Sequence, residues 1–140
     1  MARAVLIPDY MAGVSDYHEL DVYQLAHELE VRIAVILARP EIRRDVDLYG
    51  QLKRASEGPC PNIAEGFARY LPRDNARFNR IAKGSFSEII VLMTRAVRKG
   101  LIGESESEPI CRLARRARGA ATGYIRYLER ASPPNEADEA

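Results

Sequence analysis

Residues 72–100 read PRDNARFNRIAKGSFSEIIVLMTRAVRKG. Apolar and small side chains recur in this stretch at steps of three and four, which predicts one long amphipathic helix. Pro72 suits the first turn of a helix, and Gly100 suits the residue that follows its last turn. At about 1.5 Å per residue the helix is about 40 Å long. We expect it to bury Phe78, Ile81, Ala82, Ser85, Ile89, Leu92 and Ala96, with Phe86, Ile90 and Met93 widening the stripe.

The same period predicts a helix before this stretch and another after it. The earlier one begins near Asp21, whose side chain caps the free N–H groups while Gln24 reaches back, and Pro40 ends it. The later one begins at Ser105, which forms a capping box with Glu108. The expected buried residues are Val22, Leu25, Ala26, Leu29, Ile33, Ile36 and Leu37 in the first, and Ile110, Leu113, Ala114, Ala117, Ala121, Tyr124, Ile125 and Leu128 in the last.

The remaining helix is expected to begin near Asp45 or Asp47 and to continue to about residue 70. It contains Gly58-Pro59-Cys60-Pro61. Each proline removes an N–H donor and clashes with the preceding turn, so we expect a bend there. Four amphipathic helices with short joins predict an all-α fold, an antiparallel up-down four-helix bundle over residues 20–131. Residues 1–19 are predicted to be an irregular arm, and residues 132–140 a disordered acidic tail.

Charge is unevenly distributed along the chain, although the net charge is only +1. Residues 1–68 hold 7 Lys and Arg against 11 Asp and Glu, whereas residues 69–130 hold 14 against 6. A basic half favours a polyanionic partner or an acidic surface on another subunit. No apolar run reaches the roughly 18–20 residues of a membrane span, so we expect a cytoplasmic protein with no membrane partner.

Basic residues repeat along the third and fourth predicted helices at steps of three and four. Guanidinium groups at this spacing can neutralise successive phosphates without recognising the base sequence. The alternative is a solvated face, or ion pairs with the acidic first helix in the same or a neighbouring subunit. The candidate nucleic-acid-binding residues are Arg69, Arg73, Arg77, Arg80, Lys83, Arg112, Arg115 and Arg116.

The residue types that carry catalysis or bind metals are sparse. His18 and His27 form no His-Glu-x-x-His zinc motif, and no spacing links Cys60 or Cys111 to a histidine. The sequence contains no phosphate-binding glycine loop. We therefore expect no enzyme activity, no bound metal and no cofactor, with both cysteines buried as small apolar residues.

One unusual stretch, residues 54–67, places Asn62 and Glu65 one helical turn apart beside apolar positions. Polar groups there need partners, for which Arg54, Ser85 and Glu88 are candidates. In one interpretation Asn62 satisfies backbone groups near the prolines and Glu65 pairs with an arginine. In the other, the two residues line a pocket for a small ligand. We favour the first.

These stretches carry a resemblance to a known family. Asn62-Ile63-Ala64-Glu65-Gly66-Phe67, with Gln51-Leu52-x-Arg54-Ala55 before it and Phe78-x-x-x-Ala82-x-Gly84-Ser85-x-x-Glu88 after it, resembles the four-helix-bundle proteins encoded in bacterial large-subunit rRNA intervening sequences. The accessory variability protein of diversity-generating retroelements belongs to the same structural group. The similarity runs from about residue 17 to residue 102. The resemblance makes Arg54, Asn62, Glu65, Gly66, Gly84, Ser85 and Glu88 structural motif residues.

The resemblance implies a bundle that assembles into homopentamers and binds nucleic acid. Together with the basic residues, it predicts a homo-oligomer that binds RNA or DNA through the third and fourth helices. The alternative is an assembly or adaptor protein whose basic faces contact neighbouring subunits or another protein.

Overall fold

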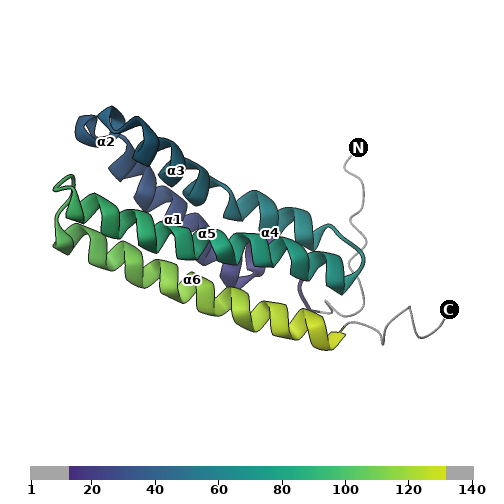
Figure 1. The fold of residues 1–140 in the computed structure, drawn as a ribbon. Helices are drawn as coiled ribbons and strands as arrows, with labels where there is room; N and C mark the ends of the chain where they lie inside the picture. Colours follow the sequence, from purple (N-terminus) through teal and green to yellow (C-terminus); the bar gives the residue numbers. More distant parts are fainter. Residues whose placement is uncertain (1–12, 132–140) are drawn as a thin grey trace.

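The computed structural model describes residues 13–131, and every regular element in that range is helical (Figure 1). The all-α prediction is therefore confirmed. Residues 1–12 of the expected arm and the expected tail lie outside the described residues. The elements are the short 3₁₀ helix η2 (Tyr17–Glu19) and the helices α1 (Asp21–Leu37), α2 (Pro40–Arg44), α3 (Val46–Glu57), α4 (Pro59–Phe67), α5 (Pro72–Arg98) and α6 (Glu104–Ala131).

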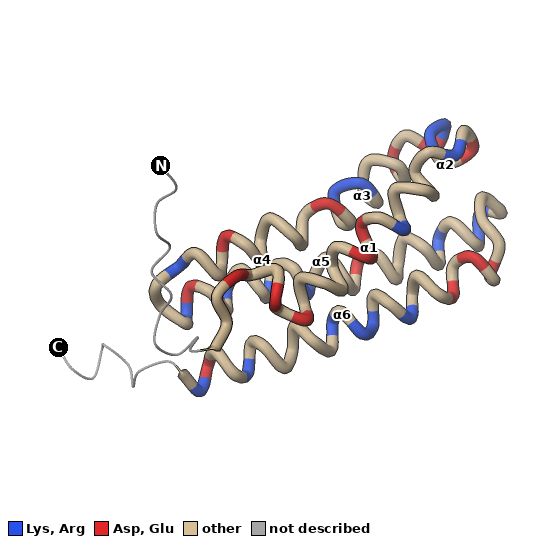
Figure 2. The backbone as a smooth tube through the Cα atoms, turned by 180° about the vertical axis from the view of Figure 1, so that it is seen from behind, with Lys and Arg blue, Asp and Glu red and all other residues tan. Residues whose placement is uncertain are grey.

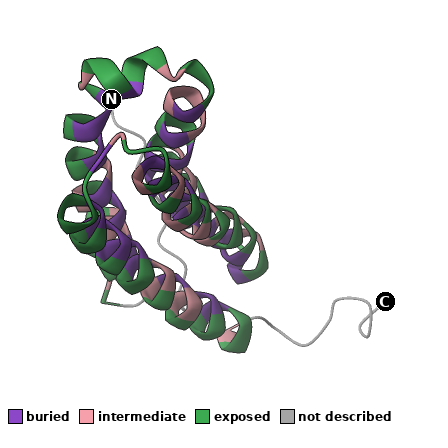
Figure 3. Cartoon of the chain, turned by 60° about the vertical axis from the view of Figure 1, so that its left-hand side comes forward, coloured by how far each residue is buried: buried purple, intermediate pink, exposed green. Residues whose placement is uncertain are grey.

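The two longest helices, α5 and α6, lie side by side along their length, and α3 and α4 follow one another beside them (Figure 1). Helix α1 packs against α6, α3 and α4, while α5 packs against α6, α4 and α3. Buried residues face inward and exposed residues cover the outside (Figure 3). The largest fully buried side chains come from α1 to α6, and they are Leu29, Ile33, Ile42, Leu48, Leu52, Ile63, Phe86, Ile89, Leu92, Met93 and Leu128.

A single residue, Gly58, separates α3 from α4, at the place where the sequence predicts a bend. Gly58 has helical dihedral angles (φ −70°, ψ −38°), and its carbonyl accepts the backbone N–H of Asn62. The chain therefore keeps its helical course through the break. The start of α3 also agrees with the sequence, since the Asp45 side chain accepts the N–H of Leu48 at 3.1 Å.

Two expected helix starts are wrong in detail. Asp21 is the first residue of α1 rather than its cap, and Gln24 reaches back to the carbonyl of His18. Helix α6 begins at Glu104, so Ser105 lies inside the helix and forms no capping box with Glu108. Instead, the Gly103 carbonyl accepts the N–H groups of the first turn. The earlier start of α6 places Glu106 where it pairs with Arg39 at the start of α2.

The short helix α2 is not predicted by the sequence, in which Pro40 is expected only to end the first helix. Pro40 instead starts α2, where its missing N–H has no helical partner to lose. Helix α2 buries Ile42 completely, which closes this end of the core. Among residues 13–131, no helix is both long and apolar enough to cross a membrane.

The residues predicted to be buried on α5 form a stripe that is rotated about the helix axis relative to the observed buried residues. Ile81 is 50% exposed, and Phe78 and Ser85 are half-buried. Asn75 and Asn79, which the prediction left outside, are completely buried. Hydrophobicity alone places Ile81 inside, whereas hydrogen bonds allow the two asparagines to take the inner positions.

Candidate functional site

The predicted binding residues lie on the outer sides of α5 and α6 and in the loop before α5. Arginines recur along the middle of α6, and Glu104, Glu106 and Glu108 gather near its first turns (Figure 2). All eight residues are exposed except Lys83, which is half-buried. We call this set the basic α5–α6 surface: Arg69, Arg73, Arg77, Arg80, Lys83, Arg112, Arg115 and Arg116.

Several arginines of the basic α5–α6 surface already pair with carboxylates. Arg69 contacts Glu65 at 2.9 Å, and Arg80 on α5 reaches Glu129 on α6 at 2.7 Å. Glu108 lies 3.9 Å from the guanidinium groups of both Arg112 and Arg115. Exposed ion pairs such as these contribute only about 0–1 kcal/mol each. A phosphate can therefore replace the carboxylate at little cost.

An aromatic ring holds two of these arginines at the start of α5. The guanidinium carbons of Arg69 and Arg77 lie 5.1 Å and 5.4 Å from the centre of the Phe78 ring. Cation–π contacts at exposed sites contribute about 0.5–1 kcal/mol. They hold both guanidinium groups near the half-buried ring, where Arg69 also pairs with Glu65.

The surface continues into a hollow between α5 and α6. The hollow has a volume of about 330 Å³. Its lining includes Arg98 and Arg115 together with Glu104 and Glu108. Arg98 is absent from the predicted set. The sequence indicated Arg98 only through its spacing of three residues from Arg95, which continues the basic pattern of α5.

The motif residues at the α3–α4 break have local partners. Asn62 donates to the Gly58 carbonyl at 2.9 Å, and exposed Glu65 pairs with Arg69. Neither contact involves the candidate partners Arg54, Ser85 or Glu88. Arg54 and Glu88 are exposed, and the Ser85 hydroxyl donates to the Ile81 carbonyl at 3.4 Å. This geometry supports the architectural interpretation over a ligand pocket.

The two motif glycines differ in what surrounds them. A Cβ atom on Gly66 would lie 2.7 Å from Asn75 Oδ1 and 3.0 Å from Phe78 Cβ, so α4 and α5 approach closely only because residue 66 has no side chain. A Cβ on Gly84, in contrast, would have nothing within 4 Å. Gly66 is required by packing within the chain, whereas packing among the described residues does not require a glycine at position 84.

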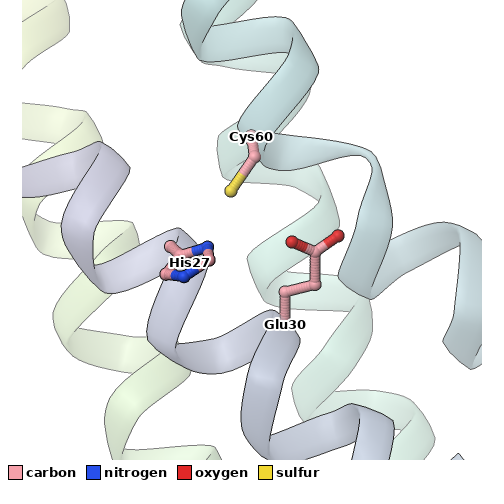
Figure 4. Close-up of side chains that lie close together, drawn as sticks. All are labelled: His27, Glu30 and Cys60. Atoms are coloured by element: carbon pink, nitrogen blue, oxygen red, sulfur yellow. The ribbon is translucent and has the colours of Figure 1, made fainter. Parts of the chain in front are cut away.

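A cluster that the sequence did not predict lies between α1 and α4. Figure 4 shows the Cys60 sulfur directed from α4 toward the ring of His27 and the carboxylate of Glu30, both on α1. The potential ligand atoms of the three residues all lie within 4.8 Å of one another. The sequence indicated only that His27 and Glu30, three residues apart, lie on the same side of a helix. Cys60 comes close to them only because α4 packs against α1.

Burial raises the pKa of two groups in this cluster, Cys60 and Glu30. It raises the pKa of the Cys60 thiol to about 12, with a smaller contribution from the negative charge of Glu30. Burial also raises the pKa of the Glu30 carboxyl, as does the nearby charge of Glu57, while His27 lowers it. Without a metal, Cys60 is therefore a protonated thiol at neutral pH, and the cluster is not an activated cysteine–histidine nucleophile.

Residues 18–122, most of the 140-residue chain, match the family model of the 23S rRNA-intervening sequence proteins. The chain belongs to this family. The resemblance seen in the motif residues is thereby confirmed. No curated protein matches the chain.

The matched range extends beyond residue 102, where the motif similarity ends, into α6. It contains the whole basic α5–α6 surface and the cluster of His27, Glu30 and Cys60. Glu129, which pairs with Arg80, lies outside it.

Proposed function

We propose that the protein is a non-enzymatic, cytoplasmic homo-oligomer, expected to be a pentamer, that binds nucleic acid through the basic α5–α6 surface. In this proposal the fold is an up-down four-helix bundle in which α3 and α4 together form one member. The observation that carries the proposal is that the residues from 69 to 130, with 14 Lys and Arg against 6 Asp and Glu, form two adjacent long helices. Cys60 and Cys111 are free thiols, as a reducing cytoplasm would keep them.

The size of the surface suits a nucleic-acid backbone. Helix α5 has 27 residues, and its exposed arginines recur along one side. Each phosphate neutralised releases counterions, so affinity falls with salt. For a duplex with four neutralised phosphates, the loss is about 100-fold between about 50 and 200 mM salt.

The test is fluorescence anisotropy with a labelled RNA hairpin and a labelled DNA duplex over a range of salt concentrations. The double variant Arg112→Glu with Arg116→Glu should lose at least about tenfold in affinity at low salt. The matched control is Arg43→Glu with Arg44→Glu, which makes the same charge change at exposed positions of α2.

A second double variant, Arg77→Glu with Arg80→Glu, asks whether α5 shares the interface with α6. It should abolish measurable binding. Absence of binding by the unchanged protein at low salt would overturn the nucleic-acid proposal. An equal loss in the α2 control would also overturn it, because the effect would then follow net charge rather than this surface.

The second candidate function, assembly with other protein subunits, is favoured by the outer face of α5. Ile81 and Val91 are 50% and 58% exposed on the side of the helix that also carries Gly84. A helix face with exposed apolar side chains around an unobstructed glycine permits close approach of another helix. Gly84, which packing among residues 13–131 does not require, then has a role between subunits.

Light scattering tests this assembly. Ile81→Lys should reduce the particle mass, whereas Val46→Lys, a control at a residue that is 78% exposed on α3, should leave it unchanged. If the arginines themselves bridge subunits, Arg77→Glu with Arg80→Glu should reduce the mass as well. A monomeric unchanged protein would exclude both forms of assembly.

A further inference from the structure

The cluster of His27, Glu30 and Cys60 presents one nitrogen, one oxygen and one sulfur donor toward a common point (Figure 4). Imidazole, carboxylate and thiolate are the three ligand types that Zn²⁺ takes from proteins. Around a tetrahedral zinc these ligand atoms lie roughly 3.3–3.7 Å apart. The atoms here all lie within 4.8 Å of one another, so each pair needs to approach by at most about 1.5 Å.

The positions of the three residues permit that approach. His27 is exposed and Glu30 is half-buried, so both side chains can turn, while Cys60 is held in the core at 8% exposure. His27 and Glu30 are one helical turn apart on α1, and Cys60 lies in the first turn of α4. One rigid donor with two adjustable ones can complete a coordination shell without moving either helix.

The charges around the cluster also favour a cation. Among residues 13–131, the carboxylate of Glu30 makes no hydrogen bond and no ion pair with a lysine or arginine. It faces the negative charge of Glu57 instead, whose own partner is Lys53 at 2.6 Å. A half-buried carboxylate in this situation gains more from a divalent ion than a solvated one does.

We propose that His27, Glu30 and Cys60 bind one Zn²⁺ per chain, with water as the fourth ligand. The sulfur donor separates this site from one for Mg²⁺ or Ca²⁺, which take oxygen ligands. On binding, the zinc–sulfur bond replaces the S–H bond, the thiol proton passes to water, and His27 coordinates as a neutral imidazole. The ion joins α1 to α4 beside the α3–α4 break.

Cobalt serves as the spectroscopic probe, used with untagged protein. Co²⁺ bound through a thiolate gives a sulfur-to-metal charge-transfer band in the near ultraviolet, and tetrahedral geometry gives intense visible bands. We expect both, at one equivalent per chain, with displacement by Zn²⁺. Cys60→Ala should remove the charge-transfer band, and His27→Gln or Glu30→Gln should each weaken Zn²⁺ binding by at least about tenfold.

The chain offers matched controls for both types of ligand. Cys111→Ser changes the other buried thiol, on α6, and His18→Gln changes the other histidine. Both should bind Co²⁺ as the unchanged protein does. Circular dichroism of Cys60→Ala checks that this variant is folded, and Cys60→Ser provides a second replacement of similar size.

The proposal is overturned if the unchanged protein shows no charge-transfer band with Co²⁺. It is also overturned if folded Cys60→Ala or Cys60→Ser keeps the band, or if Cys111→Ser loses it. These results are independent of nucleic-acid binding, because the cluster lies between α1 and α4 and not on the basic α5–α6 surface.

Discussion

The side-chain amide of Asn75 on α5 donates a 2.9 Å hydrogen bond to the hydroxyl of Tyr124 on α6. Asn79, one turn further along α5, donates to both the backbone carbonyl and the side-chain oxygen of Asn75, at 3.0 Å and 2.8 Å. Both asparagines are completely buried. The Asn75–Tyr124 bond ties α5 to α6, since sliding of one helix along the other would leave the buried Asn75 amide without its acceptor.

Replacing Tyr124 by phenylalanine should therefore destabilise the protein. The Asn75 amide would lose its acceptor while staying buried, which costs about 1–3 kcal/mol. The measurement is urea unfolding followed by circular dichroism. Tyr70→Phe removes a hydroxyl from a residue that is 73% exposed, and it should change the free energy of unfolding by less than about 0.5 kcal/mol.

The two motif glycines should respond in opposite ways to alanine. Gly66→Ala forces a Cβ to within 2.7 Å of Asn75 Oδ1 and should cost about 1–3 kcal/mol. Gly84→Ala meets open space and should stabilise the isolated chain by about 0.5–1 kcal/mol, because alanine favours helices. Unfolding at low protein concentration compares the two. Equal destabilisation by both would mean that α5 packs differently from the arrangement described.

Asp45 should make stability depend on pH in the acid range. A hydrogen bond from Lys99 at 2.6 Å, with a second from the N–H of Leu48, holds the pKa of Asp45 below its usual value. A carboxyl whose pKa is lowered by folding stabilises the protein above its unfolded pKa, and this contribution disappears as the pH falls through the folded pKa.

The variant Asp45→Asn isolates this charge, because asparagine also caps helices well. It should be less stable than the unchanged protein at neutral pH, and the two stabilities should converge as the pH falls through the lowered pKa of Asp45. Lys99→Met removes the partner instead and should reproduce most of the difference. Thermal unfolding over a pH series makes the comparison. A difference that persists at low pH would show that the effect is not the Asp45 charge.

Removing the carboxylate that occupies Arg80 should strengthen nucleic-acid binding. Glu129→Gln deletes the 2.7 Å partner of Arg80 and one negative charge beside the basic α5–α6 surface. One freed phosphate contact corresponds to a gain of several-fold at low salt. Glu57→Gln, which deletes the partner of Lys53 on α3, is the matched control and should not change affinity. Unchanged affinity in Glu129→Gln would place Arg80 outside the interface.

The sequence predicted the helices well because apolar residues at steps of three and four are typical of amphipathic helices and not of strands or loops. It placed Ile81 inside and Asn75 outside because periodicity treats polarity as exposure, whereas a buried amide with hydrogen-bond partners is stable. It did not predict that His27 lies beside Cys60. Periodicity shows which face of a helix is buried, but not which other helix packs against that face. The pairing of Arg80 with Glu129 was hidden for the same reason.

We expect the folded chain to open first at the break at Gly58. Pro59 and Pro61 have no N–H, so the carbonyls of Ala55 and Glu57 receive no backbone hydrogen bond from the residue four positions on. Local opening of a helix starts where backbone hydrogen bonds are missing. Amide hydrogen exchange in α4 should thus be faster than in the central turns of α5, and a bound ion at Cys60 would slow it. The rate of amide exchange in α4 would then measure how far the metal site at Cys60 is occupied.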